Sequence, residues 1–446
     1  MISRRSAIPC LQFAICHLSF SVCPWSLSRD SAIMEARRFG GEQGLGLSKR
    51  KEGLAMTEAT SDAFLSGQGI PVALGQIESE LIRLWGPAAD RAGAADAEGA
   101  NVTRVVLANL VVGSGPGCPQ TLETTLDTVV ARHPCRAIVL RRTDEPDRQV
   151  FAEVAALCHL PSGDRPQVCS ERIILRAGPS AMGLLPGAVR PLLEANLPFV
   201  LWWPDDPSAC EPLFRDLAEE CSRLILDLPD PSPDLEALRL GLDPSINAYS
   251  RDTAWFAITR WRELLAQFFD GPQGPQELSR IESLEVRVGV PETAAGGRPR
   301  MAAWLVAWLA GQLGWTFVSL EDEGPRHRDV VFRGPDGDVN VTMISEPVPG
   351  SNPLPQILGV ALTIGTDDGA DVLRVTRLKP GSPQVRIDRS SPVACVLPRV
   401  VSVAQVDAAG RVAAALESSR QDPPYSRALP HLFILLEDLG QLSFAQ

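Results

Sequence analysis

The first half of the chain alternates short apolar runs with amphipathic stretches. The near-continuous apolar runs predict β-strands at residues 102–112, 137–142, 171–177, 199–203 and 223–228. The amphipathic stretches predict helices at residues 121–133, 151–160, 187–196 and 212–222. Helices that recur between such strands indicate β-α-β units, in which a parallel sheet is covered on both faces. We therefore expect an α/β N-terminal domain with a mainly parallel sheet.

A different pattern begins beyond residue 228, where a stretch rich in proline and acidic residues leads into an amphipathic helix at 252–270. The sequence GPQGPQ at 271–276 is typical of a linker. The elements predicted after it are a strand at 284–290, hairpin turns at 336–337 and 380–381, and helices within 404–440. Together they predict an α+β C-terminal domain with an antiparallel sheet.

One stretch in this half, from Met301 to Leu320, contains no charged residue. About 20 apolar residues would span a bilayer, so a membrane helix has to be considered. Gly311, Gln312 and Gly314 interrupt the stretch near its middle, and WTFVSL after them favours a strand. We expect a buried helix that turns into a strand, and no membrane association.

Residues 1–55 differ from the rest of the chain. They contain eight basic and four acidic residues, whereas the whole chain has a formal net charge of −12. An arginine pair precedes a broken apolar run, but no small-residue cleavage site follows it. We expect a poorly structured extension, for which a mis-set translation start, with Met56 as the true one, is one explanation. The domains expected after it are the α/β domain at 70–245, a helical connector and linker at 246–276, and the α+β domain at 277–446.

Composition narrows the classes of function. The chain is 45% hydrophobic and 22% charged, which is typical of globular domains. The negative net charge and the lack of a lysine or arginine block argue against binding to the phosphate backbone of a nucleic acid. The ten cysteines show no zinc spacing, so we expect no metal site, and buried thiols in a cytoplasmic protein. Cys158 with Cys169, or Cys210 with Cys221, could pair only if the fold brings them together.

The carboxyl ends of parallel strands are where open α/β sheets bind ligands. After the first predicted strand, residues 113–118 read GSGPGC, a near miss of the dinucleotide fingerprint, and Arg141 and Arg142 end the next strand. Cys118 replaces the third glycine, and two prolines stiffen the turn. We therefore predict a connecting loop and no cofactor. The five histidines show no catalytic spacing, and no catalytic motif is present, so we predict no catalytic residues.

The stretch NLPFVLWWPDDP at 196–207 ends a predicted strand in two tryptophans and two aspartates. Successive strand side chains point to opposite faces, so at least one tryptophan is predicted near the rim, where tryptophan is a frequent binding hot spot. The alternative is that both lie in the core. The residues that we predict to bind a partner are Trp202, Trp203, Asp205 and Asp206, and, in the helix at 252–270, Arg260, Trp261 and Arg262.

Four separated segments resemble one known family. NLPFVLWWPDDP, RHPCRAIVL (132–140), DTAWFAITRWRELLAQFFD (252–270) and DPPYSRAL (422–429) are similar to the glucose-6-phosphate dehydrogenase assembly proteins, OpcA. The resemblance implies a non-catalytic bacterial cytoplasmic protein. Such a protein binds glucose-6-phosphate dehydrogenase as an assembly factor or allosteric activator and supports NADPH production in the oxidative pentose phosphate pathway. It implies no catalytic residues and no cofactor.

An alternative function follows from the predicted fold alone. An α/β enzyme or sensor could bind a nucleotide or a sugar phosphate at the edge of the sheet. The chain also departs from the family pattern. Cys135 stands where the family commonly has serine, and only Cys395 lies in the C-terminal domain, so the cysteine-based redox control of cyanobacterial members does not carry over.

Overall fold

The structure is a computed structural model of the whole chain. It describes residues 63–92, 102–115, 121–146, 148–159, 167–229, 235–292, 300–322, 326–349, 355–393, 395–419 and 421–437. The described residues form two compact units, one with 63–227 and 243–250, the other with 228–242 and 251–437 apart from the gaps. The predicted extension at 1–55 lies outside the described residues.

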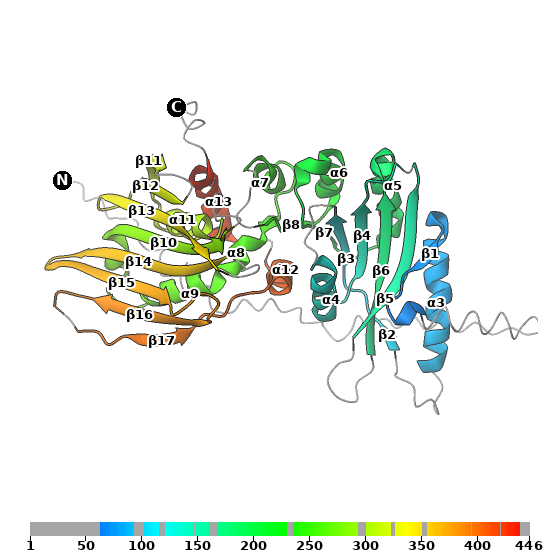
Figure 1. Cartoon of the computed structure of the whole chain (residues 1–446), viewed down its shortest axis with the longest axis horizontal. Helices are drawn as coiled ribbons and strands as arrows, with labels where there is room; N and C mark the ends of the chain where they lie inside the picture. Colours follow the sequence, from blue (N-terminus) through cyan, green and yellow to red (C-terminus); the bar gives the residue numbers. More distant parts are fainter. Residues whose placement is uncertain are drawn as a thin grey trace, which may run out of the picture. The chain divides into compact units, whose positions relative to one another are not determined.

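The first unit is built on a twisted, mixed sheet (Figure 1). Among the described residues this sheet has nine strands in the order β1-β5-β6-β4-β3-β7-β8-β9, with β2 paired to β6. Its centre is parallel, because β6, β4, β3, β7 and β8 pair in the same direction. The strands are β1 (Ile70–Val72), β2 (Val102–Arg104), β3 (Asn109–Ser114), β4 (Arg136–Arg142), β5 (Val150–His159), β6 (Gln167–Ala177), β7 (Phe199–Trp203), β8 (Arg223–Leu226) and β9 (Ser250–Asp252), of which only Ser250 is counted in this unit.

Helices and short 3-10 turns cover this sheet. The helices are α3 (Ile77–Ala92), α4 (Leu122–Arg132), α5 (Leu185–Val189) and α6 (Glu211–Glu220). The 3-10 turns are η1 (Leu74–Gln76), η2 (Pro179–Leu184), η3 (Arg190–Leu192) and η4 (Pro207–Cys210). The predicted helix at 187–196 is shorter than expected, because the helical path ends in η3, where Pro191 removes a backbone donor.

The predicted helix at 151–160 is wrong. These residues form β5, which runs antiparallel to β6 and pairs with it from Val150 to His159. Alanine, leucine and glutamate favour a helix in isolation, but the ladder to an eleven-residue neighbour and burial of the middle of β5 outweigh that preference. The sheet is therefore mixed, with antiparallel β1 and β5 beside the parallel centre.

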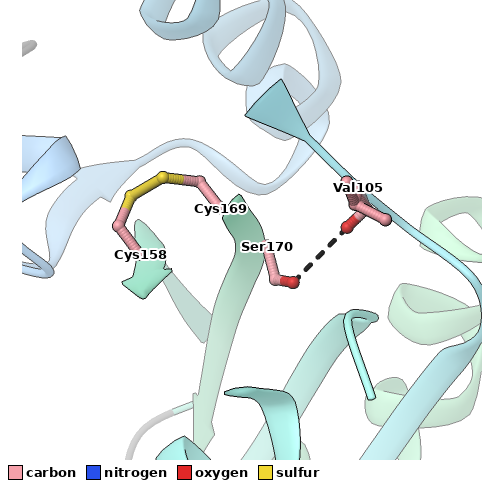
Figure 2. Close-up of a disulfide and its surroundings, with 4 residues drawn as sticks. All are labelled: Val105, Cys158, Cys169 and Ser170. Atoms are coloured by element: carbon pink, nitrogen blue, oxygen red, sulfur yellow. Dashed lines mark hydrogen bonds between the residues drawn. A yellow bond between two sulfur atoms is a disulfide. The ribbon is translucent and has the colours of Figure 1, made fainter. Parts of the chain in front are cut away.

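The β5–β6 pairing brings together one of the two cysteine pairs that the sequence left open, whereas buried free thiols were expected. Cys158 and Cys169 lie directly opposite each other in the register, with their Cα atoms 4.0 Å apart, and form a disulfide (Figure 2). Cys210 and Cys221 remain free thiols. Burial raises the pKa of the Cys221 thiol to about 12, so this side chain stays protonated and inert.

The second unit contains a mainly antiparallel sheet, as predicted (Figure 1). Its eight described strands follow the order β11-β12-β13-β10-β14-β15-β16-β17, and only the β10–β13 pair is parallel. The strands are β10 (Ile281–Pro291), β11 (Thr316–Asp322), β12 (His327–Arg333), β13 (Asp338–Val348), β14 (Gln356–Thr366), β15 (Gly369–Arg377), β16 (Gln384–Ser390) and β17 (Arg399–Ser402).

This sheet has one covered face and one open face. Along β13, buried Val339, Val341 and Met343 alternate with more exposed Asn340 and Thr342. The helices of the unit are α7 (Leu235–Leu242), α8 (Thr253–Ala257), α9 (Thr259–Gln267), α10 (Gly274–Ser279), α11 (Arg300–Leu313), α12 (Ala408–Glu417) and α13 (Pro423–Leu436). The helix predicted at 252–270 is therefore divided into α8 and α9, and the predicted linker runs into α10.

The charge-free stretch forms helix α11 followed by strand β11, as the sequence predicts. Gly314 adopts a positive φ of 68°, which ends the helix at little cost, and Trp315 beyond it is buried. The residues of α11 from Arg300 to Ala310 are all buried. Among the described residues, no helix combines the length and the hydrophobicity that crossing a membrane requires.

Candidate functional site

The stretch WWPDDP lies at the carboxyl edge of the parallel strands in the first unit. Asp205 is 6% exposed, and its carboxylate forms an ion pair with the guanidinium of Arg142, at the end of β4. Asp206 caps the 3-10 turn η4, where its carboxylate accepts hydrogen bonds from the backbone N–H and the hydroxyl of Ser208, at 2.8 and 2.6 Å. Both carboxylates therefore organise the turn after β7.

Two glycines of the near-miss fingerprint are needed there for packing. A Cβ atom at Gly113 would lie 2.6 Å from ring carbon Cε3 of Trp203. A Cβ atom at Gly115 would overlap the guanidinium of Arg142, which is the same group that pairs with Asp205. A bound dinucleotide would need this space for its pyrophosphate. In the described residues, protein side chains fill it instead; Cys118 lies outside them.

Neither tryptophan of the stretch is exposed. Trp202 is 0% exposed and Trp203 is 1% exposed, and the Trp203 ring meets Phe214 of α6 edge-on, with 5.3 Å between the ring centroids. The expectation that one of them reaches the rim is therefore wrong, because both side chains are buried and the Trp203 ring packs against Gly113 and Phe214. Contact of a partner with either ring would first require this edge to open.

The second group of candidates lies on α9. Arg260 is exposed and pairs with Glu263 at 2.8 Å, whereas Trp261 is 2% exposed. The Arg262 guanidinium lies 3.5 Å from the centroid of the Trp255 ring, and it donates to the Thr259 hydroxyl at 3.1 Å. Burial lowers the pKa of Arg262 to about 10. Of these three residues, only Arg260 faces solvent.

Two of the segments that carry the family resemblance meet inside the second unit. The backbone N–H of Asp252 donates to the Tyr425 hydroxyl at 3.2 Å, and the Asp252 carboxylate accepts from Trp304 Nε1 at 2.7 Å and lies 3.3 Å from Arg300 Nε. The Trp304 and Tyr425 rings stack with centroids 4.9 Å apart. Asp252 is 0% exposed. This cluster joins α8, α11 and α13, so we assign it to stability.

A largely buried network of ion pairs lies at the amino ends of the parallel strands in the first sheet, opposite the WWPDDP turn. Arg136, at the start of β4, donates through Nε to Glu171 at 2.7 Å, and both side chains are buried. Arg104 and Trp85 also donate to Glu171, at 2.7 and 2.8 Å, and Glu78 pairs with Arg136 at 2.6 Å. Because buried charges are costly unless fully paired, this network fixes α3 on the sheet. The network was not predicted from the sequence, because its members are far apart in the chain.

The second unit also carries an exposed apolar surface that was not predicted from the sequence. Large apolar side chains are 46% to 83% exposed around β16 and β17, and we name this group the β17-edge patch: Leu378, Val393, Val396, Leu397 and Val400. The signal for it was present, because Arg399 is the only charged residue between Ser391 and Val406. Among the described residues, no cluster of histidine, cysteine, aspartate or glutamate is arranged to hold a metal.

Comparisons with known proteins match both units. Residues 127–240 match the family model described as glucose-6-phosphate dehydrogenase subunit N-terminal domain, and residues 248–429 match the model of its C-terminal domain. Two similar cyanobacterial proteins are named as candidate OxPP cycle protein OpcA. The Synechococcus elongatus protein is 31% identical over 47% of this chain and 47% of its own length. The Synechocystis protein is 27% identical over 61% of this chain and 62% of its own length.

The matched part of the chain thus spans about half to three fifths of these relatives. Among solved structures, a 3-ketoreductase from Actinomadura kijaniata, KijD10, resembles 74% of this chain over 96% of its own length. The TM-score is 0.40 and the sequence identity 11%. A likeness this distant carries no argument about function.

Proposed function

Because this chain belongs to the OpcA family of glucose-6-phosphate dehydrogenase subunits, we propose that it binds a glucose-6-phosphate dehydrogenase and promotes the assembly or activity of that enzyme. The observation that carries the proposal is the match to both family domains, in order, over residues 127–240 and 248–429. In this role the chain is a non-catalytic cytoplasmic protein that supports NADPH production in the oxidative pentose phosphate pathway. Its acidic balance also speaks against nucleic acid as a partner.

An activator without catalytic groups must work through differential binding. It can shift the dehydrogenase towards its active conformation or oligomer only if it binds that state more tightly than the others. A tenfold preference corresponds to about 1.4 kcal/mol, which is less than the worth of one good interface hot spot. A modest docking surface is therefore sufficient for the proposed function.

Among the residues predicted to bind a partner, Arg260 and Asp206 can be reached from solvent, and we propose that they contribute at most to the rim of an interface. Trp202, Trp203, Asp205, Trp261 and Arg262 are buried. Their proposed contribution is indirect, because they keep the surfaces around them in shape.

The alternative, an enzyme or sensor with a nucleotide or sugar phosphate at the sheet edge, is less well supported. At that edge Trp203 packs over Gly113, and Arg142 is paired with Asp205. A phosphate would have to compete with the Asp205 carboxylate for the same guanidinium. The charge of Arg142 is therefore already neutralised by Asp205, and this arginine is less available to a phosphate.

Two measurements separate the candidates. The tagged chain, expressed in its own organism, is expected to co-purify with glucose-6-phosphate dehydrogenase. The melting temperature of the purified chain should not change when NADP or glucose 6-phosphate is added alone. Failure of the dehydrogenase to co-purify would contradict the proposal, and a clear melting shift with either small molecule would favour the alternative.

A further inference from the structure

The β17-edge patch runs along the last two strands of the sheet in the second unit. Val396 and Leu397 lie in the connection between β16 and β17, whereas Leu378 lies just past the end of β15. Val400 pairs with Arg386 on β16, and Arg386 pairs with Thr376 on β15. Residues paired in this way share a face, so Val400 belongs to the open face of the sheet. β16, along which the patch runs, has seven residues and is about 24 Å long.

The patch adjoins an unpaired strand edge. β17 ends the strand order, and among the described residues only β16 pairs with it. The outer backbone N–H and C=O groups of such a strand are ready to pair with another chain, and proteins commonly blunt the edge with charges. Within β17 only Arg399 is charged, and Val400 is 54% exposed. An apolar edge of this kind is a typical receiver for an added strand.

The charges around the patch indicate what fits it. Arg374 and Lys379 are exposed beside it, although the whole chain has a net charge of −12. Arg399 is exposed too, but it pairs with buried Ile387 and so lies on the opposite face of β17 from Val400, with its guanidinium 5.6 Å from the centroid of the Phe268 ring. The nearby acidic side chain Asp388 is paired with Arg386 at 2.9 Å. The surface is thus apolar with a basic rim. Its complement is an extended segment with apolar side chains and an acidic rim.

A second copy of this chain fits the patch poorly. A two-fold pair made through β17 would bring the same surface of both copies together. Lys379 and Arg399 of each copy would then face the same cations of the other, while two chains of net charge −12 also repel each other at a distance. The like charges disfavour self-association through this edge.

We propose that the β17-edge patch is the surface on which the dehydrogenase docks, by adding an extended, acidic-rimmed apolar segment to the edge of β17. This inference rests on the proposed function, because that function supplies the partner. The partner's backbone would complete the ladder, and its apolar side chains would cover Leu397 and Val400. Arg374 and Lys379 would meet its acidic rim.

The test uses the full chain and the dehydrogenase from the same organism. Leu397→Asp and Val400→Asp place a charge in the patch at side chains that are 83% and 54% exposed, so the fold should tolerate them. Val318→Asp is the matched control, because Val318 is 47% exposed on β11, the opposite end strand of the same sheet. Binding is measured by surface plasmon resonance, after melting curves have shown that the folds match. The patch variants should raise Kd about tenfold or more, and the control should leave it unchanged.

A charge variant provides an independent readout. Lys379→Glu should weaken binding most at low salt, and the loss should shrink as salt rises. If the unaltered chain binds and all four variants bind equally well, the docking surface lies elsewhere, although the proposed function stands. If the unaltered chain does not bind, the proposed function itself fails. If Leu397→Asp only converts a dimer of this chain to monomers and leaves dehydrogenase binding intact, the occupant is a second copy and the proposal is overturned.

Discussion

Loss of the Cys158–Cys169 disulfide is expected to destabilise the first unit without abolishing its fold. The bond joins directly opposed residues on β5 and β6 and closes a loop with a sequence separation of 11 (Figure 2). β5 and β6 remain paired through their backbone ladder when the bond is open. The effect should therefore come mainly from the greater freedom of the unfolded chain.

The magnitude follows from the loop length. In the chain-entropy relation a loop of 11 residues gives about 9 cal/mol/K, or about 3 kcal/mol at 25 °C. Residual pairing of β5 and β6 in the unfolded state would reduce this value, so it is an upper figure. For a unit of this size, about 3 kcal/mol corresponds to a fall in melting temperature of about 6 to 12 °C.

The assay compares thermal unfolding with and without dithiothreitol for the unaltered chain and for the double variant Cys158→Ser, Cys169→Ser. The reductant should lower the melting temperature of the unaltered chain to that of the double variant and leave the variant unchanged. Cys395→Ser, at an exposed free thiol, is the matched control and should respond like the unaltered chain. Non-reducing peptide mapping after cleavage at Asp164, between the two cysteines, should recover one linked pair.

Two results would refute this reasoning. If the linked peptide pair is missing from protein isolated with its thiols blocked at lysis, the two cysteines are not joined. If the pair is present but the reductant leaves unfolding unchanged, the bond does not constrain the unfolded chain and the loop-entropy argument fails.

Further predictions concern the core, the buried charges and the start of the chain. Trp202→Ala and Trp203→Ala should each lower the free energy of unfolding by about 3 to 5 kcal/mol in denaturant titrations. If either variant unfolds at the same denaturant concentration as the unaltered chain, the burial of that tryptophan is contradicted. Gly113→Ala should cost about 1 to 3 kcal/mol in the same assay, because its Cβ would meet the Trp203 ring. Burial raises the pKa of Asp127 above its ordinary value of 3.8, so its ionised form opposes folding increasingly as pH rises through the folded pKa. Asp127→Asn should therefore raise the melting temperature at pH 7 and leave it unchanged at a pH below the ordinary pKa of 3.8. An equal change in melting temperature under the two conditions would argue against this explanation. Deletion of residues 1–55 should leave the melting temperature and the activation of the dehydrogenase unchanged. Loss of either would show that the segment is required for folding or function.

The parallel centre of the first sheet is readable from the sequence. The runs at 137–142 and 199–203 are predicted within one residue of β4 and β7, because strands covered on both faces must be continuously apolar. β5 could not be predicted from the sequence, because Ala152, Ala155 and Ala156 favour a helix locally and only the pairing with β6 makes them a strand. The disulfide depends on that pairing, so the sequence alone could not predict it either.

The candidate site shows the same division between local pattern and tertiary context. The end of a strand and the capping role of Asp206 follow from WWPDDP itself. The burial of Trp203 depends on Gly113 from a neighbouring strand and Phe214 from α6, which local periodicity cannot identify. The β17-edge patch needs the strand order, because the local pattern does not show that β17 ends the sheet and leaves its outer backbone edge unpaired.

We propose that this chain acts on a glucose-6-phosphate dehydrogenase without catalysing the reaction. The most direct test is a kinetic titration of the organism's own dehydrogenase with the purified chain. The chain alone should show no dehydrogenase activity, and its addition should raise the activity of the enzyme or lower its substrate requirement until a plateau is reached. Dehydrogenase kinetics that stay unchanged at saturating amounts of the chain would contradict the account.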